Sequence, residues 1–296
     1  MKPTVLLAVD ERTSAMTDDD RILAAALAGQ GYAVQPLRWG ALVDPGSIIV
    51  IRSTWDYVER PAHFVEWLDH LDARQAVVFN PTPLVRWNMH KGYLCDLERA
   101  GVPVVATELI RRGESANLDE VMERRRWDDV VIKPAVGGTA RLTVHRARIG
   151  HEAAMDHLLQ LVTNEDAVVQ PYLSSITTAG EISVVAIGGQ VHMAVAKTAK
   201  PGEWRVQGDF GGRCELTAVT GEIRNVAMRA LSSVSPIPGY ARVDVVRGEN
   251  GMLLVLELEL VEPELFFRLD ATLAERFATY LAAQLNAPQS RTGSTR

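Results

Sequence analysis

The sequence predicts a mixed α/β protein that joins a parallel α/β lobe at the N-terminus to an antiparallel sheet near the C-terminus. Strand and helix patterns alternate over roughly the first 85 residues, which is typical of a parallel sheet with crossover helices. Between residues 181 and 260, strand patterns follow one another with glycine-containing turns, which favours antiparallel pairing. With 296 residues, 47% of them hydrophobic, the chain is long enough for two or three lobes.

The N-terminal part predicts four strands and two helices. The strands are expected at residues 4–9, 32–37, 47–51 and 76–79. Thr17 and the three aspartates after it indicate a helix start, because the hydroxyl caps the first turn and carboxylates complement the helix dipole. Residues 61–71 have the spacing of an amphipathic helix. Ligands of parallel sheets bind beyond the carboxyl ends of the strands, so residues 52–57 form a candidate site loop.

The pattern changes from about residue 80 onward. The next segments are expected to be a helix (88–100), an extended piece (102–106), a strand (130–134), a turn (137–141) that precedes residues 142–146, a helix (152–161) and a strand (167–173). Later strands are expected at 181–187, 190–197, 239–246 and 252–260, with a closing helix at 271–285. We therefore predict lobes at 1–85, 86–168 and 169–286, followed by a disordered polar tail at 287–296.

The composition argues against several classes of partner. A net charge of -6 lacks the basic footprint of nucleic-acid binding. No apolar run reaches the roughly 18 residues of a membrane span, and the first apolar run is too short for a secretory signal. We expect a cytoplasmic protein without nucleic-acid or membrane partners, with reduced thiols at Cys95 and Cys214, and with homo-oligomerisation left open.

Two charged pairs on neighbouring predicted strands are the most informative feature. Arg242 and Asp244 are two residues apart, as are Glu257 and Glu259, and side chains two apart on a strand point to the same face. Carboxylate oxygens at this spacing suit Mg²⁺, and Arg242 would meet phosphate. The alternative is a solvated face with cross-strand ion pairs. It is disfavoured because these carboxylates lie inside apolar strands, where unpaired charge is costly. We predict a metal site at Asp244, Glu257 and Glu259.

A lysine at the end of a strand, Lys133, precedes a small-residue loop that contains Gly137 and Gly138. A point charge beside open backbone amides suits a polyphosphate. The loop is not a P-loop, because no Gly-Lys-Ser/Thr follows. Taken alone, Lys133 would be better explained as a surface lysine before a turn, and Lys91 alone is similarly weak as a signal.

The order of these motifs resembles that of the ATP-grasp family of carboxylate ligases. The resembling parts are Asn88-x-x-Lys91, Val131-Ile132-Lys133-Pro134, the strand at 168–173, Gly180-Glu181, Arg242-x-Asp244 and Glu257-x-Glu259. The resemblance implies a fold in which two lobes clasp ATP and Mg²⁺. It implies ATP contacts from Lys91, Lys133, Gly137, Gly138, Gln170, Tyr172, Leu173 and Glu181. It implies catalytic roles near the transferred phosphoryl group for Arg242, Arg205 and Lys197.

Glu259 departs from the family pattern, because many relatives have asparagine at this position. Either Glu259 is an extra magnesium ligand, which we favour, or a neighbouring cation neutralises it.

Within the family, the chain is similar to the branch that contains the O-ureido-D-serine cyclo-ligase of D-cycloserine biosynthesis. The resembling segments are residues 51–57, 86–91, 210–212 and 257–263. The resemblance implies that ATP phosphorylates the substrate carboxylate and that the ureido nitrogen bonded to oxygen closes the ring of this antibiotic. The small-molecule amino acid would be held by Arg52, Ser53, Thr54, Trp55, Asp56 and Tyr57, with Arg52 on the carboxylate and Asp56 on the ammonium group. The alternative for this loop is simple packing by Trp55 and Tyr57.

Two other functions stay open at this point. The first is an intermolecular amino-acid or peptide ligase, which shares the activation step but uses a different acceptor. The second is a nucleotide-binding module without catalysis. The second is disfavoured because a pure binder does not need the metal carboxylates.

Overall fold

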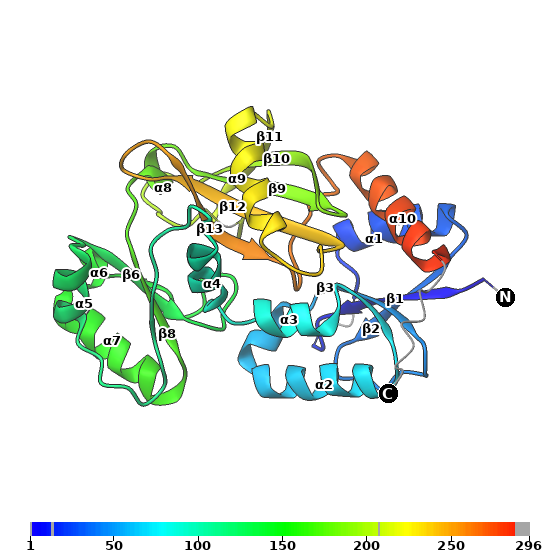
Figure 1. Cartoon of the computed structure of the whole chain (residues 1–296), viewed down its shortest axis with the longest axis horizontal. Helices are drawn as coiled ribbons and strands as arrows, with labels where there is room; N and C mark the ends of the chain where they lie inside the picture. The colour runs from blue at the N-terminus through cyan, green and yellow to red at the C-terminus, as the bar shows by residue number, and fades with distance from the viewer. Residues whose placement is uncertain (1, 13–14, 207, 288–296) are drawn as a thin grey trace.

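Three sheets form the framework of the computed structural model, which describes residues 2–12, 15–206 and 208–287 (Figure 1). Residues 288–296, most of the predicted tail, lie outside the described residues. In the view of Figure 1, the sheet that carries β6 and β8 lies at one end of the molecule, apart from the other two.

The first sheet is parallel, as predicted, with the strand order β2-β1-β3-β4. Its strands are β1 (Thr4–Val9), β2 (Ala33–Arg38), β3 (Ile48–Ser53) and β4 (Val77–Phe79). The helices α1 (Asp18–Gly29) and α2 (Pro61–Ala73) pack into different cores, α1 with Val5 and Leu7 and α2 with Ile49 and Ile51. Thr17 caps α1 through its hydroxyl, which accepts a hydrogen bond from the Asp20 backbone.

The antiparallel sheet predicted for the C-terminal part has five strands in the order β11-β10-β9-β12-β13. They are β9 (Glu181–Ile187), β10 (Gln190–Thr198), β11 (Arg213–Thr217), β12 (Tyr240–Arg247) and β13 (Leu253–Glu259). The helix α9 (Gly221–Ser232) packs with Val184 and Val243, whereas α10 (Ala271–Asn286) packs with Val185 and Tyr240. The two helices therefore cover opposite faces of the sheet. β11 and α9 were not predicted.

The third sheet is antiparallel with the order β5-β8-β6-β7. Its strands are β5 (Glu108–Ile110), β6 (Val130–Pro134), β7 (Val144–His145) and β8 (Ala167–Pro171). The helices beside it are α5 (Leu118–Arg125), α6 (Arg146–Ile149) and α7 (His151–Asn164), and the short α8 (Ser175–Thr178) follows β8. β5 and α5 were not predicted.

The helix predicted at 88–100 is two helices, α3 (Thr82–Asn88) and α4 (Tyr93–Arg99), separated by a turn that carries Lys91. The turn forms because the Lys91 backbone N–H donates to the Ala135 carbonyl (2.7 Å) and does not continue a helix. The Gly92 N–H donates to His90 Nδ1 (3.0 Å). A side chain at Gly92 would meet this imidazole, since a Cβ there would lie 2.8 Å from His90 Nδ1.

The hydrophobic cores cross the predicted lobe boundaries. Leu94 and Leu97 of α4 belong to the core beneath the C-terminal sheet. The closing helix α10 shares a core with α1 of the N-terminal sheet, and the two helices lie together in Figure 1. The lobe boundaries at residues 85 and 168 therefore stay a prediction.

Candidate active site

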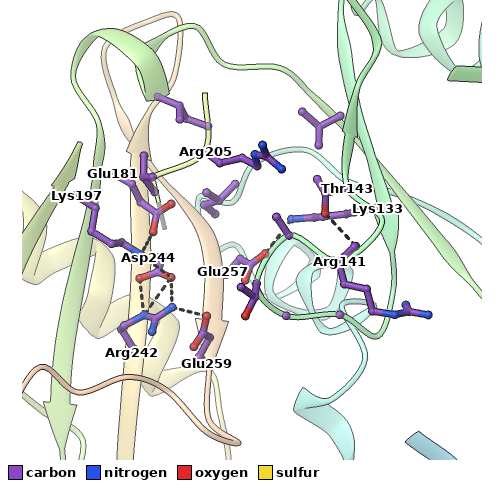
Figure 2. Close-up of a pocket in the computed structure, with 18 of the residues that line it drawn as sticks. Lys133, Arg141, Thr143, Glu181, Lys197, Arg205, Arg242, Asp244, Glu257 and Glu259 are labelled. Atoms are coloured by element: carbon purple, nitrogen blue, oxygen red, sulfur yellow. Dashed lines mark hydrogen bonds and ion pairs between the residues drawn. The ribbon is translucent and has the colours of Figure 1, made fainter. Parts of the chain in front are cut away.

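A cavity of about 450 Å³ lies between β6 and β8 on one side and the C-terminal sheet on the other (Figure 2). Most of the predicted site residues line it: Trp55, Lys91, Lys133, Gly137, Gly138, Gln170, Leu173, Glu181, Lys197, Arg205, Arg242, Asp244, Glu257 and Glu259. These residues come from positions far apart in the sequence, and the fold brings them to one place.

The two charged pairs lie directly opposite each other on β12 and β13. Arg242 is the register partner of Glu259, and Asp244 is that of Glu257. Arg242 donates from Nε and Nη2 to the two oxygens of Asp244 (2.9 and 2.8 Å) and also pairs with Glu259. The predicted convergence of these four side chains on one face is thus confirmed.

Both predicted phosphate lysines reach the same carboxylate oxygen. Lys91 Nζ lies 3.1 Å and Lys133 Nζ 2.9 Å from Glu257 Oε1. Burial alone would raise the pKa of Glu257, but the two ammonium groups outweigh it and hold the pKa below its usual range. Burial, together with the neighbouring Lys91, lowers the pKa of Lys133 despite the attraction of Glu257. Glu257 therefore holds two cations close together that would otherwise repel each other.

Lys197 extends this alternation of charges along the sheet. It pairs with Glu181, its register partner on β9, and its Nζ lies 3.6 Å from Asp244 Oδ2. Figure 2 shows the resulting row of alternating charges, which runs from Glu181 through Lys197, Asp244 and Arg242 to Glu259.

Glu259 at the end of this row and Glu262 near it have raised pKa values. Burial raises the pKa of Glu259 to about 7 against the attraction of Arg242, and Asp244 and Glu257 raise it further. Burial, reinforced by Glu259, raises the pKa of Glu262 to about 8. Because burial and neighbouring carboxylates disfavour the charged form of both groups, an added cation would be favourable here.

The carboxylates of Asp244, Glu257 and Glu259 fit magnesium only if a bound molecule such as a nucleotide supplies further oxygen ligands. Among the described residues, no three side chains of His, Cys, Asp or Glu are already spaced as a metal cage. The reason is visible in the pairing: Arg242 bridges Asp244 and Glu259, and two lysines hold Glu257. Magnesium is usually held by one or two carboxylates together with substrate phosphates, so hard oxygen donors in this arrangement suit a metal that arrives with a nucleotide.

Gln170 and Leu173 also line the cavity. Gln170 Nε2 donates to Thr107 Oγ1 (3.0 Å), which fixes the buried amide. Tyr172 does not line the cavity: its ring stacks on His145 at 3.8 Å between centres, and its N–H donates to the Asp129 carbonyl (2.9 Å). This corrects the expected contact, because the Tyr172 N–H is already used.

Arg205 lines the cavity without touching the row of carboxylates shown in Figure 2. Its Nε and Nη2 donate to Glu203 (3.0 and 2.8 Å), and its guanidinium stacks 3.6 Å above the centre of the Phe210 ring. The hydrogen bonds from Arg205 lower the pKa of Glu203 to about 2.

The candidate substrate loop is corrected by the structure in most of its residues. Arg52 is buried; its Nη1 donates to the Pro263 carbonyl (3.1 Å) and its Nε lies 3.4 Å from Asp20 Oδ1. Asp56 accepts a hydrogen bond from Trp39 Nε1 (2.6 Å). The other residues of the loop, Ser53, Thr54 and Tyr57, are also buried and do not line the cavity. Of the six residues, Trp55 lines the cavity, and its Nε1 donates to the Glu262 carbonyl (3.2 Å).

Several lining residues were missed by the sequence analysis. They include Arg141, Thr143, Trp204, Cys214, Glu262, Glu264 and Arg268. Glu262 lies within the segment at 257–263 that resembles the cyclo-ligase branch, so a signal was present. The Arg141 guanidinium points away from the cavity in Figure 2 and pairs with Glu165 (3.0 Å).

Fold and site together define a ligase of the ATP-grasp class, and comparison with known proteins agrees. A RimK-like ATP-grasp domain model matches residues 94–265, and a model of the N-terminal domain of D-cycloserine synthetase DcsG matches residues 5–80. The chain is 32% identical over 251 residues to the cycloserine biosynthesis protein DcsG of Streptomyces lavendulae, covering 80% of this chain and 83% of that protein. It belongs to the ATP-grasp family, in the group of DcsG.

Solved structures give the same result. The crystal structure of D-cycloserine synthetase DcsG matches with a TM-score of 0.86 at 29% identity, over 95% of this chain and 99% of that one. D-alanine–D-alanine ligase from Bacillus anthracis complexed with ATP matches with a TM-score of 0.66 at 13% identity, over 96% and 98% of the two chains, which shows the fold alone.

The protein is therefore an ATP-dependent carboxylate-amine ligase, and the non-catalytic binding module is set aside. No helix in the described part of the chain is long and apolar enough to cross a membrane.

Proposed function

We propose that the protein binds ATP and Mg²⁺ in this cavity, activates the carboxylate of O-ureido-D-serine as an acyl phosphate and closes it to D-cycloserine. The observation that carries the activation step is the meeting of Lys91, Lys133, Arg242 and the metal carboxylates in one cavity. The likeness to DcsG, which extends into the N-terminal domain, supports the choice of substrate.

Nucleotide binding exchanges partners within the site. Lys91 and Lys133 would exchange the shared oxygen of Glu257 for phosphate oxygens, which would satisfy both ammonium groups. Gly137 and Gly138 would offer backbone amides to the phosphates, and Gln170 and Leu173, which also line the cavity, would border the adenine. Glu181 is assigned to the ribose end, although in the free protein it pairs with Lys197.

Asp244, Glu257 and Glu259 would hold magnesium, which supplies charge neutralisation and a template for the phosphates. When the nucleotide enters, Lys91 and Lys133 would leave Glu257, and its carboxylate would then be available to magnesium. In the free protein Glu259 is instead neutralised by Arg242, the second of the two roles considered for it. Once the phosphates arrive, Arg242 is placed to turn toward the transferred phosphoryl group, with Lys197 beside it.

The second step is an attack within the substrate. The ureido nitrogen bonded to oxygen attacks the acyl phosphate carbon, phosphate leaves, and water hydrolyses the carbamoyl group to carbon dioxide and ammonia. The protein needs no separate nucleophile, since binding holds the two ends of one molecule together. Trp55 is the member of the predicted substrate loop that we retain, because it lines the cavity.

Mass spectrometry of the reaction with ATP, Mg²⁺ and O-ureido-D-serine tests the proposal. We expect D-cycloserine, ADP and phosphate, formed without any added amine. A product that appears only when a second amino acid is added would favour the intermolecular ligase. ATP hydrolysis without product would contradict the substrate while leaving the family assignment intact.

A further inference from the structure

The acidic side chains of the cavity differ in whether they have a cationic partner. Six carboxylates line it, and five of them form ion pairs within the protein. The five are Glu181 with Lys197, Asp244 and Glu259 with Arg242, Glu257 with Lys91 and Lys133, and Glu264 with Arg268. Glu262 is the sixth, and within the described residues no lysine, arginine or histidine lies at ion-pair distance from it.

The segment that carries Glu262 is held firmly by its backbone carbonyls. The Glu262 carbonyl accepts from Trp55 Nε1 (3.2 Å) and the Pro263 carbonyl from Arg52 Nη1 (3.1 Å). The Val261 carbonyl accepts from the Tyr240 hydroxyl (3.0 Å). Arg52 of β3, Trp55 just after β3 and Tyr240 of β12 thus fix the backbone that carries Glu262, and its side chain lines the same cavity as the metal carboxylates.

The surroundings of Glu262 leave its charge uncompensated. Burial and the nearby Glu259 carboxylate raise its pKa, and Lys91 and Arg242 act on it only from longer range. The Tyr57 hydroxyl lies beside it but carries no charge. A half-buried carboxylate without a cation is costly, so a ligand that brings a cation gains binding energy here.

The substrate has such a cation at the right distance. Its carboxylate has to face Arg242 and the metal carboxylates for phosphoryl transfer, and the α-ammonium group is two bonds from the carboxylate carbon. Glu262 follows Glu259 by three residues and lines the same cavity. A cation attached next to the reacting carboxylate therefore falls within reach of Glu262.

We propose that Glu262 binds the α-ammonium group of the amino-acid substrate, in a subsite bordered by Trp55, and so selects amino acids over carboxylic acids that lack the amino group. The inference rests on the proposed function, because it takes the carboxylate to be activated beside Arg242. It replaces Asp56 in the role that the sequence analysis gave it, since Asp56 is turned toward Trp39.

The test compares O-ureido-D-serine with its analogue that lacks the amino group, 3-(ureidooxy)propanoate, in the wild type and in Glu262→Gln. The wild type should prefer the amino acid in kcat/KM by about 10- to 100-fold, the loss expected for one charged hydrogen bond. In Glu262→Gln this ratio should fall close to one, while the KM for ATP and the Mg²⁺ concentration for half-maximal rate stay unchanged.

Glu264→Gln is the matched control, because Glu264 lines the same cavity but is paired with Arg268. It should keep the wild-type ratio between the two substrates. An unchanged ratio in Glu262→Gln would overturn the inference. A higher Mg²⁺ requirement with an unchanged ratio would make Glu262 a metal ligand instead.

Failure of the proposed function gives a different result. If the wild type releases no ADP with O-ureido-D-serine, the same comparison is made for each amino acid in a panel against its analogue without the amino group. For the amino acid that supports ADP release, the preference in kcat/KM over its analogue without the amino group should again be lost in Glu262→Gln. If the wild type and Glu262→Gln show the same preference, the inference is contradicted even though the substrate was not O-ureido-D-serine.

Discussion

Individual residues of the site have one set of partners in the free protein and are assigned another in the working enzyme. Glu257 is the clearest case, because the carboxylate that holds Lys91 and Lys133 in the free protein is one of those proposed to hold magnesium. Glu257→Gln should reduce the rate of ADP release by about 100-fold or more, since the metal loses a charged ligand where the phosphoryl charge develops. Circular dichroism should show an intact fold. Near-normal turnover at ordinary magnesium concentration would contradict the metal site.

Arg52 should contribute mainly to stability. It pairs with the buried Asp20, donates to the Pro263 carbonyl and lies over the rings of Tyr240 and Phe267. Arg52→Ala should lower the free energy of unfolding by about 3–5 kcal/mol, because it leaves a buried carboxylate unpaired. Urea unfolding measures this.

The double variant Arg52→Met with Asp20→Asn is the control for Arg52, and it should recover part of the loss, since neither charge then remains. A raised KM for the amino acid with unchanged stability would instead restore the substrate role that the sequence suggested.

The sequence predicted the positions of the metal-site residues correctly but not the position of the Arg52 side chain. Arg242, Asp244, Glu257 and Glu259 were placed correctly on one face because their spacing is a local property of two strands. The direction of Arg52 depends on Pro263, 211 residues away in the sequence, and no local pattern contains that information.

The turn between α3 and α4 is the element that positions Lys91. The Lys91 N–H donates to the Ala135 carbonyl, and the Ala135 N–H donates to the Asp166 carbonyl (2.8 Å). The carboxylate of Asp166 in turn meets His90 Nε2 (3.1 Å) and Arg111 Nη1 (2.8 Å). The turn is thus attached to the ends of β6 and β8, the two strands that border the nucleotide cavity.

Asp166→Asn should weaken ATP binding by about five-fold, equivalent to roughly 1 kcal/mol, because the turn loses a charged anchor and Lys91 becomes less well placed. Calorimetric titration with ATP measures the effect, and kcat at saturating ATP should change less. Arg111→Ala is the control, since it removes one partner of Asp166 and keeps His90. Equal ATP affinity in Asp166→Asn and the wild type would contradict the positioning role.

Among the elements, the sequence predicted those with a strong period and missed those that depend on a neighbour. β11 is polar and mostly exposed at a sheet edge, and β5 has three residues, so neither has a pattern of its own. α9 did have a signal: Thr220 caps it, and Ile223, Val226 and Ala227 have helical spacing. The helix at 88–100 was predicted as one piece because the periodicity does not show where Ala135 binds the Lys91 N–H.

At the scale of the whole molecule, the site lies between the sheet of β6 and β8 and the C-terminal sheet (Figure 2), and Trp55, which follows β3 of the N-terminal sheet, also lines it. α10 ties the C-terminal sheet to α1, and Gly138 of the phosphate loop lies against Val58, since a Cβ at Gly138 would be 3.8 Å from the Val58 side chain. The class of fold followed from the alternation of elements, whereas the shared cores could not be seen in the sequence because they join segments from opposite ends of the chain.

The raised pKa values of two carboxyl groups in the cavity make the stability of the free protein depend on pH. The pKa values of Glu259 and Glu262 are raised to about 7 and about 8, above the roughly 4.3 of an unfolded glutamate. Between these values the folded state binds more protons than the unfolded state, so the free energy of unfolding falls as pH rises from about 4.5 to 8. Glu257 and Glu203, whose pKa values are lowered, titrate below this window. His192, whose pKa burial lowers, acts in the opposite sense near the acidic end of the window.

The comparison of the wild type with Glu262→Gln isolates one contribution, because His192 and the other groups are common to both proteins. Urea unfolding at pH 5, 6, 7 and 8 without nucleotide should show a steeper loss of stability in the wild type, and the variant should be relatively more stable at pH 8 than at pH 5. The reason is that a neutral amide never has to lose a proton in the buried cavity. Parallel pH profiles in the two proteins would show that the cavity does not hold the Glu262 carboxyl in its protonated form.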